Sequence, residues 1–201
     1  DPGGDWDKDH DGHYGWTADE ILNGLHPGDG KLSDWLTDHD PDVLIVHIGT
    51  NDLNDGQTVS STIEDVRQIV VTARAHDAEI DVVLATLIAS NTPTRQAAIT
   101  MFNLALPGLV AELDTPGARV VLADLASGYQ GTWNYDDLHP GPLGQTHMAT
   151  GFATALLSNG LVNVGAPPPP GACGTSVEAE DATLTGTIVS TSYAGASGGL
   201  V

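Results

Sequence analysis

Apolar residues follow two patterns along the chain, short continuous runs and longer stretches with helical spacing. Continuous runs at 43–48, 82–87 and 120–124 are rich in Val, Ile and Leu, which is typical of parallel strands buried on both faces. Helical spacing predicts a helix over 59–76, a second that begins at Thr92-Pro93, and a last one from Pro142 to about Ser158. This alternation predicts an α/β fold with a parallel sheet covered on both faces.

The predicted sheet has few strands for the number of predicted helices. A capping box, Thr17-Ala18-Asp19-Glu20, begins a short helix, and Gly15 lies just ahead of its N-terminus. Within the second main helix, Pro107 is expected to kink or restart the chain. Since three strands make a thin sheet, the sequence predicts that the first strands of the domain are missing from the front.

The overall charge narrows the classes of partner. Six basic residues stand against 27 acidic ones, which gives a formal charge of -21. Nucleic acids and anionic membranes need a positive protein surface, so we expect neither as a partner. The composition favours a secreted, extracellular protein; its oligomeric state is left open.

The composition changes near residue 164 and divides the chain into three parts. Residues 1–163 carry the α/β pattern, and residues 164–174 form a Pro-rich, extended linker. Residues 175–201 are rich in Thr, Ser, Val and Gly, as in a β module, but hold only about two strands. We therefore expect 175–201 to be the start of a second domain. The lone Cys173, within this linker, has no partner cysteine in this chain.

Two short polar segments carry the candidate chemistry. Gly49-Thr50-Asn51-Asp52 follows the first buried run, at the end of a strand where ligands gather in open α/β sheets. An amide side chain there, such as that of Asn51, could donate a hydrogen bond to an oxyanion. Asp136 and His139 have the spacing of an orienting carboxylate and a general base. His47 is expected to satisfy a hydrogen bond in the core, and His147 to contribute packing.

Together these segments resemble the SGNH (GDSL-type) hydrolase family, over roughly residues 5–160. Gly15 matches the glycine of the family's second block, Gly49-x-Asn51-Asp52 the third, and Asp136-x-x-His139-Pro140 the fifth. The resemblance implies a three-layer α/β/α, flavodoxin-like fold. It further implies that His139 is the general base, Asp136 its orienting partner, and Gly15 and Asn51 the oxyanion hole, without a catalytic cofactor. An unrelated flavodoxin-like protein is the alternative.

Two further resemblances point to polysaccharide. The segment Asp9 to Thr17 looks like the matching stretch of secreted acetylxylan-type carbohydrate esterases. The C-terminal segment from Val177 resembles the start of a carbohydrate-binding module, in which paired glutamates commonly hold a structural calcium. That resemblance implies calcium binding by Glu178 and Glu180, and a partial β-sandwich over 175–201.

The chain departs from the family at the nucleophile. The first block, Gly-Asp-Ser, is absent, and none of the ten serines follows Gly-Asp after an apolar strand. Gly195-Ala-Ser197-Gly-Gly199 matches a nucleophile elbow in letters, but it lacks the strand before and the helix after that an elbow requires. We therefore expect an N-terminal truncation, an inactive fragment, and an open hydrogen-bonding edge on the strand at 43–48.

The sequence as a whole predicts a serine ester hydrolase that removes acetyl groups from plant polysaccharide such as xylan, in the intact parent protein. A non-catalytic carbohydrate-binding protein with a degenerate hydrolase fold is one alternative. A lipase or thioesterase of the same family is the other, because specificity depends on loops that the sequence does not resolve.

Overall fold

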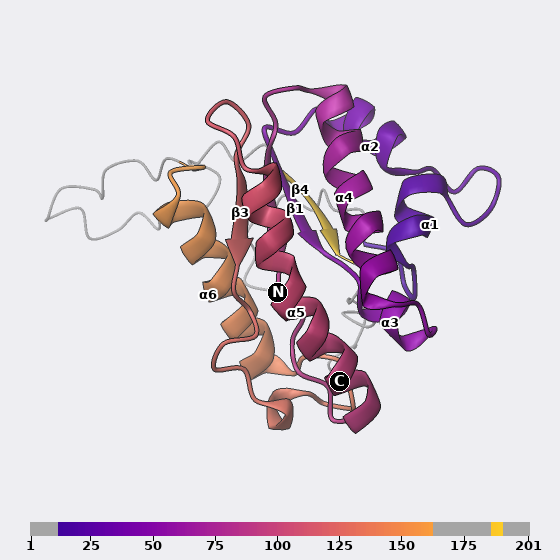
Figure 1. Cartoon of the computed structure of the whole chain (residues 1–201), viewed down its shortest axis with the longest axis vertical. Helices are drawn as coiled ribbons and strands as arrows, with labels where there is room; N and C mark the ends of the chain where they lie inside the picture. Colours follow the sequence, from indigo (N-terminus) through magenta and orange to yellow (C-terminus); the bar gives the residue numbers. More distant parts are fainter. Residues whose placement is uncertain (1–11, 163–185, 191–201) are drawn as a thin grey trace, which may run out of the picture.

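A parallel sheet with strand order β3-β2-β1-β4 runs through the centre of the molecule (Figure 1). The computed structural model describes residues 12–162 and 186–190. Its strands are β1 Val43–His47, β2 Asp81–Ala85, β3 Val120–Ala123 and β4 Gly186–Ser190. Every neighbouring pair is parallel, with Val43 opposite Asp81 and Val82 opposite Val120. The α/β fold and the three predicted strands are therefore confirmed.

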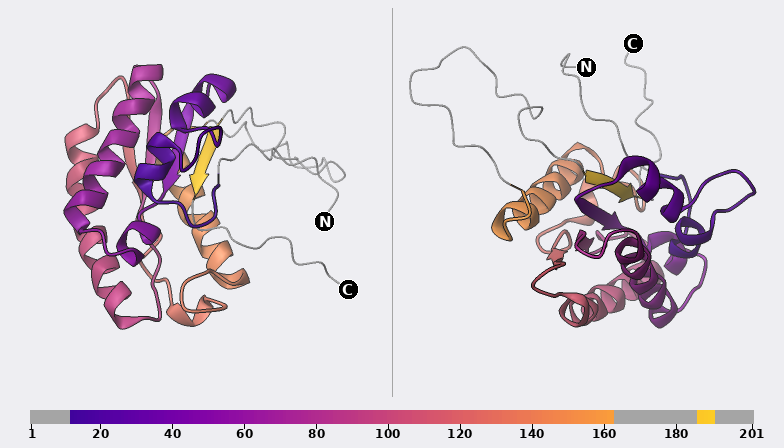
Figure 2. Two further views of the ribbon diagram at one scale, coloured as in Figure 1. Left: turned by 90° about the vertical axis from the view of Figure 1, so that its right-hand side faces the viewer. Right: turned by 90° about the horizontal axis from the view of Figure 1, so that it is seen from above.

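Helices cover both faces of this sheet (Figure 2). One face carries α4 and α5, with α1 and α2 beside α4, and the other face carries α6. The bounds are α1 Ala18–Asn23, α2 Leu32–His39, α3 Thr50–Asn54, α4 Val59–His76, α5 Pro93–Leu113 and α6 Pro142–Ser158, with a 3-10 turn, η1, at Gly131–Trp133.

The alternation of side chains along each strand builds two cores. In β1, Leu44 and Val46 point to the core beneath α4 and α5, while Val43 and Ile45 point to the smaller core beneath α6. Burial on both faces explains why these strands read as continuous apolar runs. Polar residues therefore enter only at the strand ends, which is where the candidate site lies.

Two local features differ from what the sequence indicated. The polar segment after β1 forms the short helix α3, which the sequence did not indicate. Pro107 lies inside α5, which neither ends nor restarts there. The proline is on the exposed side of the helix, while Phe102, Leu106 and Leu109 are buried, so packing on the sheet holds the helix continuous across it.

The predicted open edge of the first strand is also wrong. Residues 186–190 form β4 and pair with β1 in parallel, with Val43 opposite Gly186 and His47 opposite Ser190. An unpaired strand edge offers a row of N–H and C=O groups, and a β-branched segment such as Thr187-Ile188-Val189 is suited to pair with it. A stretch assigned from sequence to a separate module thus contributes a strand to the main sheet.

One helix of the described residues, α5, is long and apolar enough to cross a membrane by length and composition. Its residues Ile99, Phe102, Leu106 and Leu109 are buried in the core beneath the sheet. The apolar residues of α5 are therefore accounted for by packing against the sheet.

Several sequence predictions lie outside the described residues. These are the linker at 164–174, the calcium ligands Glu178 and Glu180, Cys173, and the β-sandwich expected over 175–201 apart from β4. They stay predictions.

Candidate active site

Asp136 and His139 form a hydrogen-bonded pair in the loop between η1 and α6. Oδ2 of Asp136 lies 2.7 Å from Nδ1 of His139. The other oxygen, Oδ1, accepts the backbone N–H groups of Leu138 and His139, each at 2.7 Å. The Asp136 carboxylate therefore both fixes the loop backbone and orients the His139 ring. The ring of Tyr135 stacks on that of His139, with centroids 5.6 Å apart and planes 16° from parallel.

These hydrogen bonds also keep Asp136 ionised. Burial alone would raise the pKa of Asp136, but the His139 amide, the His139 ring and the Leu138 amide together hold the pKa below its usual value. A carboxylate at Nδ1 places the imidazole proton on that nitrogen, an assignment made from the hydrogen-bond network. Nε2 of His139 is then left with its lone pair, as a general base requires.

Asn51 lies at the carboxyl end of β1 and bonds the residue that follows Gly15. Nδ2 of Asn51, in the first turn of α3, donates to the carbonyl of Trp16 at 2.8 Å. An amide side chain has two N–H groups, so this bond fixes the side chain and leaves the second N–H for a ligand. Gly15 has a φ of +78°, a conformation that other residues adopt only with strain.

Gly49 allows the chain to turn from β1 into α3. Its φ is +116°, and a Cβ there would lie 3.1 Å from Cγ2 of Thr62 and 3.3 Å from Cε2 of Phe102. A side chain would therefore both strain the backbone and push α3 away from α4 and α5. The position of Asn51 depends on this close approach.

Asp52 joins α3 to the N-terminus of α1. Its carboxylate is fully buried and accepts the N–H of Ala18 at 3.0 and 3.2 Å. Ala18 is the first residue of α1, where exposed N–H groups favour negative charge. Asn51 and Asp52 therefore hold the segment of Gly15 from two adjacent positions.

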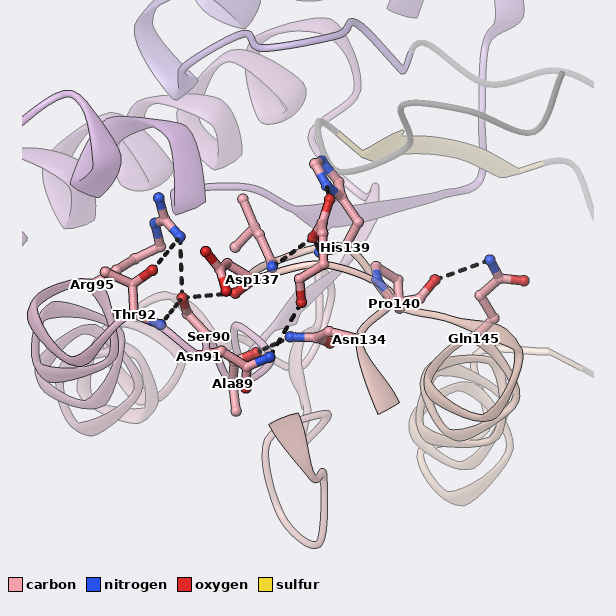
Figure 3. A network of polar contacts seen from close by, with 12 residues as sticks. Ala89, Ser90, Asn91, Thr92, Arg95, Asn134, Asp137, His139, Pro140 and Gln145 are labelled. Carbon is pink, nitrogen blue, oxygen red and sulfur yellow. Dashed lines mark hydrogen bonds and ion pairs between the residues drawn. The ribbon is translucent and has the colours of Figure 1, made fainter. Parts of the chain in front are cut away.

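The loop between β2 and α5 supports the loop of His139 (Figure 3). The N–H of Asn91 donates to the carbonyl of Asp137 at 2.9 Å, and the Asn91 side chain donates to the carbonyl of Asp136 at 3.2 Å. Nδ2 of Asn134 donates to the carbonyl of Ala89 at 2.8 Å. Two segments that are about 45 residues apart in sequence thus form one unit at the carboxyl end of the sheet.

Sequence reasoning missed Ser90, Asn91 and Arg95 as parts of this site. The available signal was the polar run Ser90-Asn91-Thr92, which follows the predicted strand at 82–87 and so lies at the sheet edge where sites form. Ser90 is no free nucleophile, because its Oγ donates to the carbonyl of Asp137 at 3.0 Å.

The prediction for His47 is wrong. Both ring nitrogens of His47 are buried without a hydrogen-bond partner in the described residues. The ring faces the α6 core, where it meets Phe152 edge to face at 6.4 Å. His147, by contrast, packs its ring against Tyr129 and Trp133, with Nε2 3.1 Å from the carbonyl of Leu125.

His47 and Asp52 give stability opposite dependences on pH. Burial lowers the pKa of His47 to about 4, so its contribution is full above the ordinary value of 6.5 and is lost as pH falls through 4. Burial raises the pKa of Asp52 to about 6, against the opposing Ala18 N–H. Its contribution is full below the ordinary value of 3.8 and is lost as pH rises through 6. The two effects oppose each other between these values.

We expect single variants to expose each slope. In Asp52→Asn the free energy of unfolding should fall more steeply than in the wild type as pH drops from 6.5 to 4, by about 3 kcal/mol in total. In His47→Phe the free energy of unfolding should instead rise relative to that of the wild type over the same pH range, by a similar amount. Urea unfolding curves between pH 4 and pH 7 measure both slopes. Profiles parallel to that of the wild type would contradict the assignment.

No group of three or more His, Cys, Asp or Glu side chains in the described part of the chain could hold a metal ion. The clustered polar groups are instead an imidazole with its carboxylate, and an amide next to a glycine turn. This set can move a proton and donate hydrogen bonds to a developing negative charge.

Comparison with protein families gives one match over most of the chain. The model described as "GDSL-like Lipase/Acylhydrolase family" matches residues 3–147. No curated protein sequence matches the chain.

Several solved structures share the fold. A carbohydrate esterase of family 3 from Talaromyces cellulolyticus is 27% identical, with a TM-score of 0.69 over 77% of this chain and 72% of that one. An acetyl esterase mutant with an acetate ion is 27% identical, with a TM-score of 0.68 over 75% and 71%. A family 3 carbohydrate esterase from Clostridium thermocellum, at 24% identity and a TM-score of 0.62 over 76% and 71%, shows likeness of fold.

Proposed function

Because this chain belongs to the GDSL-like lipase/acylhydrolase family, we propose that it carries the acid–base pair and the oxyanion donors of a serine esterase that deacetylates plant polysaccharide such as xylan. The observation that carries the proposal is the contact between Asp136 and His139, in which a low-pKa carboxylate holds the imidazole by Nδ1. The likeness to a family 3 carbohydrate esterase and to an acetyl esterase supports acetate as the acyl group.

In the proposed reaction a serine Oγ attacks the acetyl carbonyl while Nε2 of His139 takes the hydroxyl proton. The negative charge that develops on the carbonyl oxygen is bound by the Gly15 N–H, the second N–H of Asn51 and the serine's own N–H. His139 then returns the proton to the sugar oxygen, which leaves as a hydroxyl. Water, activated by His139, hydrolyses the acetyl-serine and releases acetate.

The nucleophile in this proposal comes from residues encoded before Asp1. The support is the missing Gly-Asp-Ser block in the sequence, and the engagement of the Ser90 hydroxyl with Asp137. We call the polypeptide that includes those residues the full-length protein. We further propose that it is secreted, and that Glu178 and Glu180, which precede β4 in the sequence, bind calcium in a segment that contributes to polysaccharide binding.

We expect the full-length protein to release acetate from acetylated xylo-oligosaccharides, and to hydrolyse long-chain lipid esters at least about 100-fold more slowly in kcat/KM. A mismatch of this size in the acyl pocket corresponds to roughly 3 kcal/mol of transition-state binding. Acetate release measured against fatty-acid release from a matched glycerol ester decides the point. Faster lipid hydrolysis would favour the lipase alternative, and binding of xylan without hydrolysis would favour a degenerate, non-catalytic fold.

A further inference from the structure

Arg95 connects the two halves of the candidate site. It lies in the first turn of α5, and its Nε and Nη2 donate to Oδ1 of Asn54 at 3.2 and 2.7 Å. Its Nη1 donates to Oγ of Ser90 at 3.2 Å and to Oγ1 of Thr92 at 3.3 Å. One guanidinium therefore contacts α3 with one edge and the β2–α5 loop with the other. Figure 3 shows the contacts of Arg95 with Ser90 and Thr92.

The hydroxyl of Ser90 passes this contact on to the loop of His139. Ser90 is buried, and its Oγ accepts from Arg95 and from the N–H of Thr92 at 3.2 Å. A hydroxyl has two acceptor lone pairs and one proton, so that proton goes to the carbonyl of Asp137 at 3.0 Å. A cationic donor polarises the hydroxyl and strengthens the hydrogen bond that it donates.

The carbonyl of Asp137 lies between two residues of the loop that carries His139. Asp136 bonds the His139 ring, and the N–H of Leu138 donates to Asp136. The Asp137 carbonyl accepts a second hydrogen bond from the N–H of Asn91 at 2.9 Å. Movement of this carbonyl would move the turn that Asp136 closes around His139. The chain of contacts from Arg95 thus ends directly beside the acid–base pair.

The other end of this series of hydrogen bonds is Asn54 on α3, the helix that also carries Asn51. Asn54 is three residues after Asn51, within the five-residue helix α3. The other three arginines bond elsewhere. Arg67 pairs with Glu112 and Arg119 with Asp114, and Arg74 donates to the carbonyls of Leu113 and Ala118. In the described residues, Arg95 is the arginine whose hydrogen bonds join α3 to the β2–α5 loop.

We propose that Arg95 and Ser90 are positioning residues that set the separation between the Asn51 amide and the His139 imidazole. This inference rests on the proposed esterase function. Hydrolysis needs the base and the oxyanion donor on either side of one carbonyl group, and a misplacement of about 1 Å costs up to about 100-fold in rate. Arg95 and Ser90 act through Asn51 and His139 and do not touch the substrate.

The first test compares two arginines. In the full-length protein, Arg95→Met should lower kcat on an aryl acetate by about tenfold to a hundredfold with little change in KM. Arg67→Met is the matched control, because it removes an arginine whose ion pair lies far from the site. Its partner Glu112 is roughly 25 Å further along α5 than Arg95. That control should keep kcat within about twofold, and thermal unfolding should show both variants folded. Equal losses of kcat in the two variants would overturn the proposal.

Coupling and conservative replacement separate positioning from general stability. Ser90→Ala should lose kcat as Arg95→Met does, and Ser90→Thr should recover most of it because the hydroxyl remains. In a double-mutant cycle, Arg95→Met should cost much less in an Asn51→Ala background than in the wild type. Additive losses, or no recovery in Ser90→Thr, would show that the network does not act through the site residues.

A measurement without turnover keeps this inference separate from the proposed function. The NMR signal of the Nδ1 proton of His139, which Asp136 binds, should shift or broaden in Arg95→Met and stay unchanged in Arg67→Met. A full-length protein without esterase activity would refute the proposed function, while this signal would still report on the network. An unchanged His139 signal in Arg95→Met would overturn the positioning role.

Discussion

His139→Ala in the full-length protein should reduce kcat for an aryl acetate by about six orders of magnitude, the usual loss when the base of a serine triad is removed. The reason is that, in the proposed reaction, Nε2 of His139 both takes the serine proton and returns it to the leaving sugar oxygen. Asp136→Asn should cost less, about four orders of magnitude, since the ring stays in place with the wrong nitrogen protonated. Steady-state kinetics with active-site titration of the wild type measures these losses.

A second histidine–carboxylate pair provides the control for this experiment. Nε2 of His76, at the end of α4, lies 3.1 Å from Oδ1 of Asp40. His76→Ala should leave kcat unchanged. Helix α4 ends near the amino ends of the strands, where β2 begins, whereas the site lies at their carboxyl ends. Full activity in His139→Ala would remove the triad assignment altogether.

Asn51→Ala should lower kcat by two to three orders of magnitude, the typical cost of one lost oxyanion donor. KM should change little, because the hydrogen bond strengthens as charge develops on the carbonyl oxygen. Asn51→Asp should lose at least as much, since it keeps the shape of the side chain but places an acceptor where a donor is needed. Kinetic constants for the three proteins give the answer.

The expected control for Asn51 is Asn23, an exposed amide that donates to Asp19 on α1. Asn23→Ala should match the wild type in kcat and KM. If Asn51→Ala instead raised KM at constant kcat, the amide would be a ground-state binding group and the oxyanion assignment would be wrong.

Periodic segments were the part of the fold that the sequence predicted well. The helix predicted over 59–76 has those bounds, and so does the helix from Pro142 to Ser158. Each has apolar residues at a spacing that lies on one face only if the segment is helical. The need to bury that face therefore explains both the sequence pattern and the helix. The three buried strands follow for the same reason.

Features held by distant contacts could not be predicted in this way. Helix α3 has five residues, too few for local stability, and it is fixed by Asn51 to Trp16 and by Asp52 to Ala18. Strand β4 depends on the free edge of β1, which lies about 140 residues earlier in the sequence. No local pattern reports such partners.

The candidate site divides along the same line. Asp136 and His139 are three residues apart and bond within one loop, so their spacing, together with the family resemblance, indicated the pair. The bond between Ser90 and Asp137 joins residues 47 positions apart, and that between Arg95 and Asn54 joins residues 41 apart. These side chains carry no motif, and only the folded sheet brings them together.

The most direct test of the esterase assignment is covalent labelling of the full-length protein with a fluorophosphonate, followed by identification of the modified residue by mass spectrometry. We expect one labelled serine, in the segment before Asp1, and loss of labelling in His139→Ala because the base no longer activates the hydroxyl. Labelling of a serine within residues 1–201, or labelling that persists in His139→Ala, would contradict the account.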